Sequence, residues 1–377
     1  MLRFDSLLAV LVTATVACAA CKQGPVDKPG TATATASGAS AASSKAGETT
    51  TIIGAGATFP YPIYARWGHS YNKDTGVQLN YQSIGSGGGI KQIKARTGDF
   101  GASDAPMKPE ELAAAGLVQF PMILGGVVPA VNLKGLADKA LALDGPTLAA
   151  IYLGEIKLWN DPRIAGQNPG VALPATQITP VYRADGSGTT WVFTNYLSKV
   201  SPGWKEKAGF NTTVSWPVGV GGKGNEGVAA YVQRVEGSIG YVEYAYALQN
   251  KLAVARMKNA DGQVVEPGVE SFQAAAASAD WKNAPGFYLV LTEQAGAKTW
   301  PISGASFILM HKVQPDRAKA EVMLNFFDYA YRAGDDAAVE LHYVPMPDAV
   351  VAVVQEAWAR EFTADGKPVW PANVAGK

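Results

Sequence analysis

Four glycine- and hydroxyl-rich segments contain the residues of this chain that are best suited to bind a ligand. They lie at residues 54–60, 85–90, 100–106 and 183–190. Each is expected between a strand and a helix, where the first backbone N–H groups of the helix lack partners and the helix dipole favours an anion. The hydroxyls of Thr58, Ser86, Ser187 and Thr189 add donors. Together the segments predict an oxyanion-binding cradle, although ordinary helix capping is the alternative for any one of them.

Arg183 is the expected cationic partner of the anion. Its fork of N–H donors suits a tetrahedral oxyanion, and it begins the last of the four segments. Asp185, two residues later, is expected to pair with Arg183 and to hold its guanidinium in place. An Asx-turn in the Asp-Gly pair is the other role open to Asp185.

The carboxylate of Asp104 indicates that the ligand carries a proton. A carboxylate repels an anion unless it accepts a hydrogen bond from a proton on that anion. Phosphate keeps at least one proton near neutral pH and sulfate has none, so Asp104 would favour phosphate over sulfate. Capping of a helix ahead of Pro106 is the alternative role for this carboxylate.

Short β-rich runs alternate with helical ones along the chain, which is typical of an α/β protein. We expect strands at residues 51–54, 77–83 and 239–247, helices at 60–71, 144–153, 190–200, 225–235, 315–333 and 347–362, and apolar crossings at 118–132 and 300–311. The crossings predict two α/β lobes joined by crossover hinge strands. Lobe I would comprise residues 51–126 and 301–377, and lobe II residues 127–300.

The composition agrees with two lobes and excludes some partners. A chain of 377 residues, 47% of them hydrophobic, can bury one large core or two ordinary ones. Because 32 Lys and Arg balance 32 Asp and Glu, the overall charge points to neither nucleic acid nor a membrane surface. Anion selectivity must therefore be built locally.

Residues 1–21 are typical of an export signal, with Arg3 before an apolar run and small residues after it. Cys21, preceded by two alanines, is the candidate for lipidation as in a bacterial lipoprotein. Cys18 is a rival, and simple cleavage after Ala19 is a further alternative. Each of these readings places the protein outside the cytoplasm, in the periplasm or at the cell surface.

Residues 22–50 are rich in Ala, Ser, Thr, Gly and Lys and lack apolar periodicity. Such a segment buries too little surface to offset its chain entropy, so it predicts a flexible tether. A tether favours the lipoprotein interpretation, because an anchored chain needs slack to reach a partner.

Catalytic, metal and cofactor chemistry are not expected. Both cysteines lie in the signal, and the three histidines, His69, His311 and His342, are scattered. No His, Asp and Glu cluster has metal-ligand spacing. Residues 219–224 match G-x-G-x-x-G, but a lone match is weak evidence for a dinucleotide site. An extracellular phosphomonoester hydrolase, the alternative function, would need a base beside Ser187 or a metal cluster.

Six motifs also occur in the order of a known family. Residues 54–62, 85–89, 99–106, 183–189, 221–227 and 239–246 resemble the phosphate-binding protein of the high-affinity bacterial phosphate ABC importer. The similarity runs from about residue 51 to the C-terminal region. It implies a type II periplasmic-binding-protein fold with phosphate held between two lobes.

The resemblance also implies the ligand contacts and the partners. Matched by position, the contacts are Thr58, Phe59 through its backbone N–H, Ser86, Asp104, Arg183, Ser187, Gly188 and Thr189. The expected function is to capture inorganic phosphate outside the cytoplasm and deliver it to the permease subunits of an ABC transporter, as a monomer and without a cofactor. A binding protein of this fold for sulfate or molybdate is a further alternative.

Overall fold

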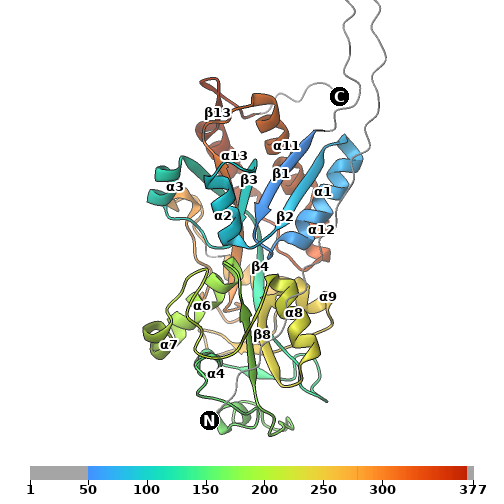
Figure 1. Ribbon diagram of the computed structural model, residues 1–377, viewed down its shortest axis with the longest axis vertical. Coiled ribbons are helices and arrows are strands. Elements are labelled where there is room, and N and C mark those ends of the chain that lie inside the picture. The colour runs from blue at the N-terminus through green and yellow to red at the C-terminus, as the bar shows by residue number, and fades with distance from the viewer. Residues whose placement is uncertain (1–49, 278, 372–377) are drawn as a thin grey trace, which may run out of the picture. The chain divides into compact units, whose positions relative to one another are not determined.

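The computed structural model describes residues 50–277 and 279–371, which lie within one compact unit, Glu48–Lys377. The expected signal at residues 1–21, the lipidation candidate Cys21 and the tether up to residue 49 lie outside the described residues. The described chain is a mixed α/β fold, as expected from its alternating elements (Figure 1).

One group of strands contains both ends of the described chain. Its order is β2 (Gln78–Ser83), β1 (Thr51–Gly56), β3 (Phe100–Ser103), β12 (Ser303–His311) and the first part of β4 (Leu117–Val131). Strand β1 is parallel to β2 and β3, whereas β12 is antiparallel to β3 and β4. Its helices are α1 (Tyr61–Thr75), α2 (Ser86–Lys94), α3 (Pro109–Ala115), α11 (Arg317–Ala333), α12 (Asp335–Glu340) and α13 (Asp348–Glu361).

The second group is built on the other part of β4. Strand β8 (Ser238–Glu243) is antiparallel to β4, and β6 (Thr179–Arg183) and β7 (Val220–Gly222) follow in parallel. Strand β9 (Ala253–Val254) also pairs with β4. The longer helices of this group are α4 (Gly145–Tyr152), α6 (Gly188–Val200), α8 (Gly224–Arg234) and α10 (Val269–Ala276), and the shorter ones are α5 (Pro162–Ala165), α7 (Pro202–Lys207) and α9 (Tyr244–Gln249).

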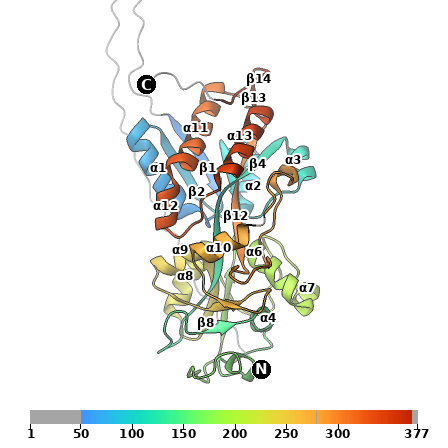
Figure 2. The same ribbon diagram turned by 180° about the vertical axis from the view of Figure 1, so that it is seen from behind.

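Short pieces complete the fold. Strands β5 (Ala142–Leu143), β10 (Arg256–Lys258) and β11 (Val264–Val265) form a small sheet, β13 (Thr363–Ala364) and β14 (Lys367–Pro368) form a hairpin, and Pro285–Phe287 is a 3₁₀ turn. Figure 2 shows from behind how α11 and α13 lie over the first group of strands.

Strand β4 connects the two groups, which we call lobe I and lobe II. All 15 of its residues are buried, as expected for an apolar strand that passes through the interior. Its residues from Leu117 to Gly126, apart from Met122 at a register shift, pair with β12, and Val127 to Val131 pair with β8. The ladder partners thus change between Gly126 and Val127. The complete lobe bounds, residues 51–126 with 301–377 and 127–300, stay a prediction.

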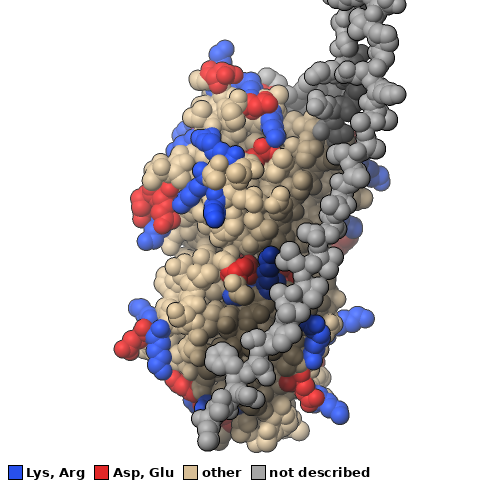
Figure 3. Space-filling model, viewed as in Figure 1, with Lys and Arg blue, Asp and Glu red and all other residues tan. Residues whose placement is uncertain are grey.

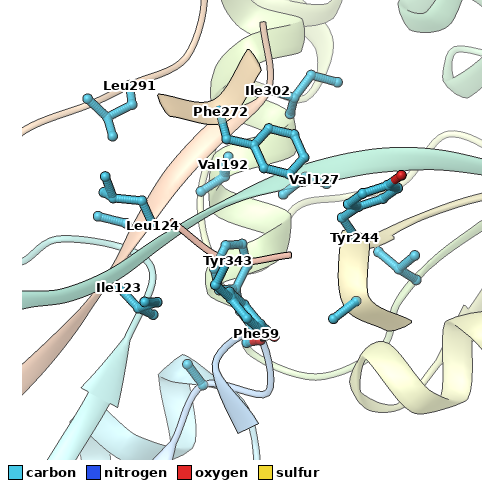
Figure 4. Close-up of a cluster of buried hydrophobic side chains, with 14 of the residues drawn as sticks. Phe59, Ile123, Leu124, Val127, Val192, Tyr244, Phe272, Leu291, Ile302 and Tyr343 are labelled. Atoms are coloured by element: carbon cyan, nitrogen blue, oxygen red, sulfur yellow. Dashed lines mark hydrogen bonds between the residues drawn. The ribbon is translucent and has the colours of Figure 1, made fainter. Parts of the chain in front are cut away.

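Two glycines of β4 let aromatic rings pack against the crossing. A Cβ on Gly125 would lie 2.9 Å from the Phe59 ring, and one on Gly126 would lie 2.1 Å from the Phe272 ring. Because successive residues of a strand face opposite sides, the two rings cover opposite faces of β4. Figure 4 shows Phe59 lying with Tyr343 and Phe272 across the strand. Side chains thus fix the region where the chain passes between the lobes.

One predicted strand is wrong in its second half. The alternation of residues 239–247 predicts one strand, but β8 ends at Glu243 and α9 begins at Tyr244. The Glu243 carboxylate accepts a hydrogen bond of 2.8 Å from the Ala245 backbone N–H, which caps the helix. A glutamate is an uncommon N-cap, so the sequence gives little sign of this boundary.

Acidic and basic side chains are interspersed over the face seen in Figure 3, in keeping with the balanced charge of the chain. No helix within residues 50–277 and 279–371 is long and apolar enough to span a bilayer.

Candidate functional site

The predicted site residues of the two lobes lie against one another. The Gly188 N–H, in the first turn of α6, donates to Ser86 Oγ, in the first turn of α2, at 3.0 Å. Beside it, the Gly87 N–H donates to the Gly186 carbonyl at 2.9 Å. These contacts bring the starts of two helices from different lobes together, which is where backbone N–H groups can bind an anion.

Gly188 must be a glycine for this close approach. A Cβ at this position would lie 2.4 Å from Ser86 Oγ and 2.6 Å from Asp104 Oδ2. Ser86 Oγ also accepts a hydrogen bond of 3.1 Å from the Asp104 backbone N–H. The segments that begin at residues 85, 100 and 183 therefore meet at Ser86, as the sequence predicted for a common cradle.

Thr58 brings in the first segment. Its Oγ1 accepts a hydrogen bond of 2.6 Å from Asn225 Nδ2, and the same amide nitrogen lies 3.2 Å from Thr189 Oγ1. The Asn225 side-chain oxygen, Oδ1, accepts a hydrogen bond of 2.9 Å from the Glu243 backbone N–H, which fixes the orientation of the side-chain amide. Asn225 thus holds one hydroxyl from each lobe.

Arg183 lies at the end of β6 with its side chain 1% exposed. Its Nε and Nη2 contact the two oxygens of Asp185 at 2.8 and 2.5 Å, and its Nη1 lies 3.3 Å from Thr189 Oγ1. The Gly224 N–H also donates to Asp185, at 3.0 Å. Partial burial would raise the pKa of Asp185, but the bonds from Arg183 and Gly224 outweigh it and hold the pKa below its ordinary value. The predicted pairing of Arg183 with Asp185 is present, and Asp185 fixes the guanidinium.

The Asp104 carboxyl is 2% exposed, and its Oδ1 has no hydrogen-bond partner among the described residues. Burial raises its pKa to about 7, against the opposing effects of Ser306, Arg183 and Ser86. Helix capping does not explain this carboxyl, because the N-cap of α3 is Lys108.

Ser187 and Phe59 complete the predicted set. Ser187 is the N-cap of α6, and its Oγ accepts from the Thr190 N–H at 3.0 Å, which leaves its own O–H free to donate. Phe59 is buried in the turn before α1, and its carbonyl accepts from the Tyr343 hydroxyl at 2.7 Å. The structure therefore brings all eight predicted contact residues to one region, and Asn225, Glu243 and Tyr343 are the supports that our reading of single residues missed.

Cavities lie both at this region and away from it. A cavity of about 160 Å³ is lined by Thr58, Asp185 and Glu226, among others. A larger groove of about 580 Å³ between α3 and α13 contains none of the predicted site residues. Within the described ranges no group of His, Cys, Asp and Glu could hold a metal ion.

The raised pKa of Asp104 predicts a pH-dependent stability. Its folded-state pKa of about 7 lies above the ordinary aspartate value of 3.8, so this group stabilises the fold most below pH 4, and that contribution is lost as the pH rises through 7. Asparagine does not titrate, so Asp104→Asn should become steadily more stable relative to the unsubstituted protein over this window, by up to about 4 kcal/mol. Urea unfolding at a series of pH values in phosphate-free buffer measures the difference. A difference that stays constant with pH would contradict the shift.

Known proteins resemble this chain in sequence and in fold. Residues 38–333 match the model of the PBP superfamily domain. The phosphate-binding protein PstS of Pasteurella multocida is 55% identical over 85% of this chain and 93% of its own length. That of Xylella fastidiosa (strain 9a5c) is 56% identical over 82% of this chain and 85% of its own.

The chain belongs to the PstS phosphate-binding protein family. PstS proteins are substrate-binding proteins rather than enzymes, in agreement with the expectation that this chain is not an enzyme. The family resemblance of the six motifs is thereby confirmed.

Solved structures of low identity share the fold. A high-affinity periplasmic phosphate-binding protein, PfluDING, aligns with a TM-score of 0.66 at 22% identity, over 85% of this chain and 96% of its own. A phosphate ABC transporter substrate-binding protein from Clostridium perfringens aligns with a TM-score of 0.58 at 19% identity, over 79% of this chain and the whole of its own. The type II periplasmic-binding fold is therefore confirmed for this PstS family member.

Proposed function

We propose that this chain captures inorganic phosphate between its two lobes, outside the cytoplasm, and delivers it to an ABC importer. The proposal is supported above all by the hydrogen bond between Ser86 and Gly188, which come from opposite lobes. The buried Arg183 and Asp104 belong to the same site. A tetrahedral anion there would meet donors on several sides. The PstS relatives are phosphate-binding proteins, and the structural neighbour from Clostridium perfringens is a phosphate ABC transporter substrate-binding protein, which supports the same ligand and the same transport role.

The site residues divide the recognition of phosphate among them. Arg183 supplies the compensating charge with its geometry fixed by Asp185. Hydroxyls of Thr58, Ser86, Ser187 and Thr189 and backbone N–H groups of Phe59 and Gly188 supply the neutral donors. Asp104 accepts a hydrogen bond from a protonated oxygen of the ligand, and sulfate has no such oxygen.

Hinge motion would open and close the lobes, and only the closed form would meet the permease. The interlobe hydrogen bonds of Ser86, Gly87 and Thr58 are the contacts that would form on closure. The proposal includes the periplasm or cell surface as the location, a monomeric state, and a lipid anchor at Cys21, with Cys18 or simple cleavage after Ala19 as alternatives.

Small-angle X-ray scattering on the compact unit, residues 48–377, tests the closure. Adding phosphate to ligand-free protein should lower the radius of gyration, because the open form is more extended. Sulfate at the same concentration should leave it unchanged. An equal response to both anions, or none to phosphate, would contradict the proposed function.

A further inference from the structure

Three buried oxygen atoms without hydrogen-bond partners lie in one place behind the candidate site. They are Asp104 Oδ1, Ser306 Oγ and Tyr64 OH, each without a partner among the described residues. Buried polar groups are rarely left unpaired in folded proteins, so a cluster of three calls for an explanation. None of the phosphate contacts proposed above uses Ser306 or Tyr64.

The sheet brings Ser306 beside Asp104. Strands β3 and β12 are antiparallel, with Phe307 paired to Ser103, so the next residue of each strand, Ser306 and Asp104, are neighbours at the end of the ladder. A register shift between Ser306 and Phe307 in the pairing with β4 changes the path of the chain at this point. Bulges of this kind commonly re-aim a side chain next to a functional site.

Tyr64 also lies near Ser306 and Asp104. The Ser306 hydroxyl is close enough to lower the pKa of both Asp104 and Tyr64, which burial raises in each case. The Tyr64 ring is held by Trp67, at a centroid distance of 5.8 Å, and edge-on by Tyr81, at 5.3 Å. The ring is therefore fixed by packing, while the two hydroxyl hydrogens can rotate to suit their acceptors.

We propose that Ser306 and Tyr64 form a relay behind Asp104, in which Tyr64 donates to Ser306 and Ser306 donates to Asp104 Oδ1. The relay stabilises the ionised carboxylate, which keeps Asp104 Oδ2 available to accept a hydrogen bond from the O–H group of phosphate. The inference rests on the proposed function for its ligand, but the relay itself is a property of this chain. Ser306 and Tyr64 are positioning residues, because they act through Asp104.

Other charged and titratable groups also act on Asp104. The Arg183 guanidinium favours its ionised form. Burial raises the pKa of Glu243, Tyr81 and Tyr343, and the charge of Asp104 raises each of them further. Ser306 thus adds a neutral donor to the stabilisation of the carboxylate that Arg183 and Ser86 provide.

Titration of the Asp104 carboxyl carbon by NMR in phosphate-free buffer tests the relay directly. Ser306→Ala should move its midpoint upward by about one pH unit, the equivalent of a tenfold change in the ionisation equilibrium. Tyr64→Phe should move it in the same direction by less. The control, Ser198→Ala, removes another buried hydroxyl without a partner and should leave the midpoint in place. An unchanged midpoint in Ser306→Ala would overturn the relay.

Phosphate affinity over the same pH range gives a second readout. In Ser306→Ala the affinity should fall about tenfold at pH 6 but less than about threefold at pH 9, where the carboxylate is ionised in both proteins. A loss of equal size at every pH would mean that Ser306 only shapes the site, which would also overturn the relay. If the unsubstituted protein binds no phosphate while the NMR midpoint still shifts, the relay stands and the proposed function fails.

Discussion

Replacing Arg183 with alanine should weaken phosphate binding more than any other single change in the site. Its guanidinium is almost fully buried and is paired with Asp185 through Nε and Nη2, which leaves Nη1 on the side of Thr189. Truncating a buried, hydrogen-bonded charge typically costs about 3–5 kcal/mol, partly because the remaining charge is left unpaired. Calorimetry should therefore show a loss of about 100- to 5,000-fold in affinity.

Two further variants distinguish loss of the ligand contact from damage to the fold as the cause of weaker binding. In Arg183→Ala with Asp185→Ala no unpaired carboxylate remains, and the affinity should stay low. Arg163→Ala removes an exposed arginine that pairs with Asp161 over the same spacing of two residues, with Nε 3.2 Å from Oδ1, and should bind phosphate normally. Recovery of affinity in the double variant would show that the arginine serves only to neutralise Asp185.

Asp104→Asn should reduce the discrimination between phosphate and sulfate. The asparagine amide can donate to an oxygen that carries no proton, whereas the buried carboxylate of Asp104 faces such an oxygen with no donor between them. We expect sulfate to bind at least about 100-fold more tightly to the variant, since an unmatched buried polar group can account for factors of about 10⁴. Phosphate should be weakened less than in Arg183→Ala, because the amide oxygen still accepts a hydrogen bond.

Competition calorimetry with both anions measures the two affinities in one series. The matched control is Asp316→Asn, which changes an aspartate outside the site. Asp316 is the N-cap of α11, and its Oδ1 accepts a hydrogen bond of 3.1 Å from the Lys319 backbone N–H. It should preserve the preference for phosphate. Unchanged selectivity in Asp104→Asn would argue against proton sensing, even if phosphate affinity fell.

The glycine and hydroxyl segments were readable from the sequence because the chemistry of anion binding is local. A Ser or Thr at a helix start has the same donors wherever the helix lies, and Arg183 with Asp185 is a pair two residues apart. The crossing of β4 was also predictable, because a long run of apolar residues is typical of a strand that is buried on both faces. The motif order then identified the family.

The supports of the site were not predicted, because they depend on long-range contacts. Asn225 contacts Thr58 across 167 positions of the chain, and Tyr343 contacts Phe59 across 284. Ser306 lies in an apolar strand, where a serine gives no sign that it faces a carboxyl. Periodicity likewise failed at residues 239–247, where the cap at Glu243 converts a strand pattern into a helix start.

Isothermal titration of ligand-free protein with phosphate, followed by sulfate, tests the central claim most directly. At pH 9, where the buried Asp104 carboxyl is ionised, we expect tight binding of one phosphate per chain and no heat from sulfate, because the carboxylate requires a proton on the ligand. Binding of sulfate as tight as that of phosphate, or of neither anion, would contradict it.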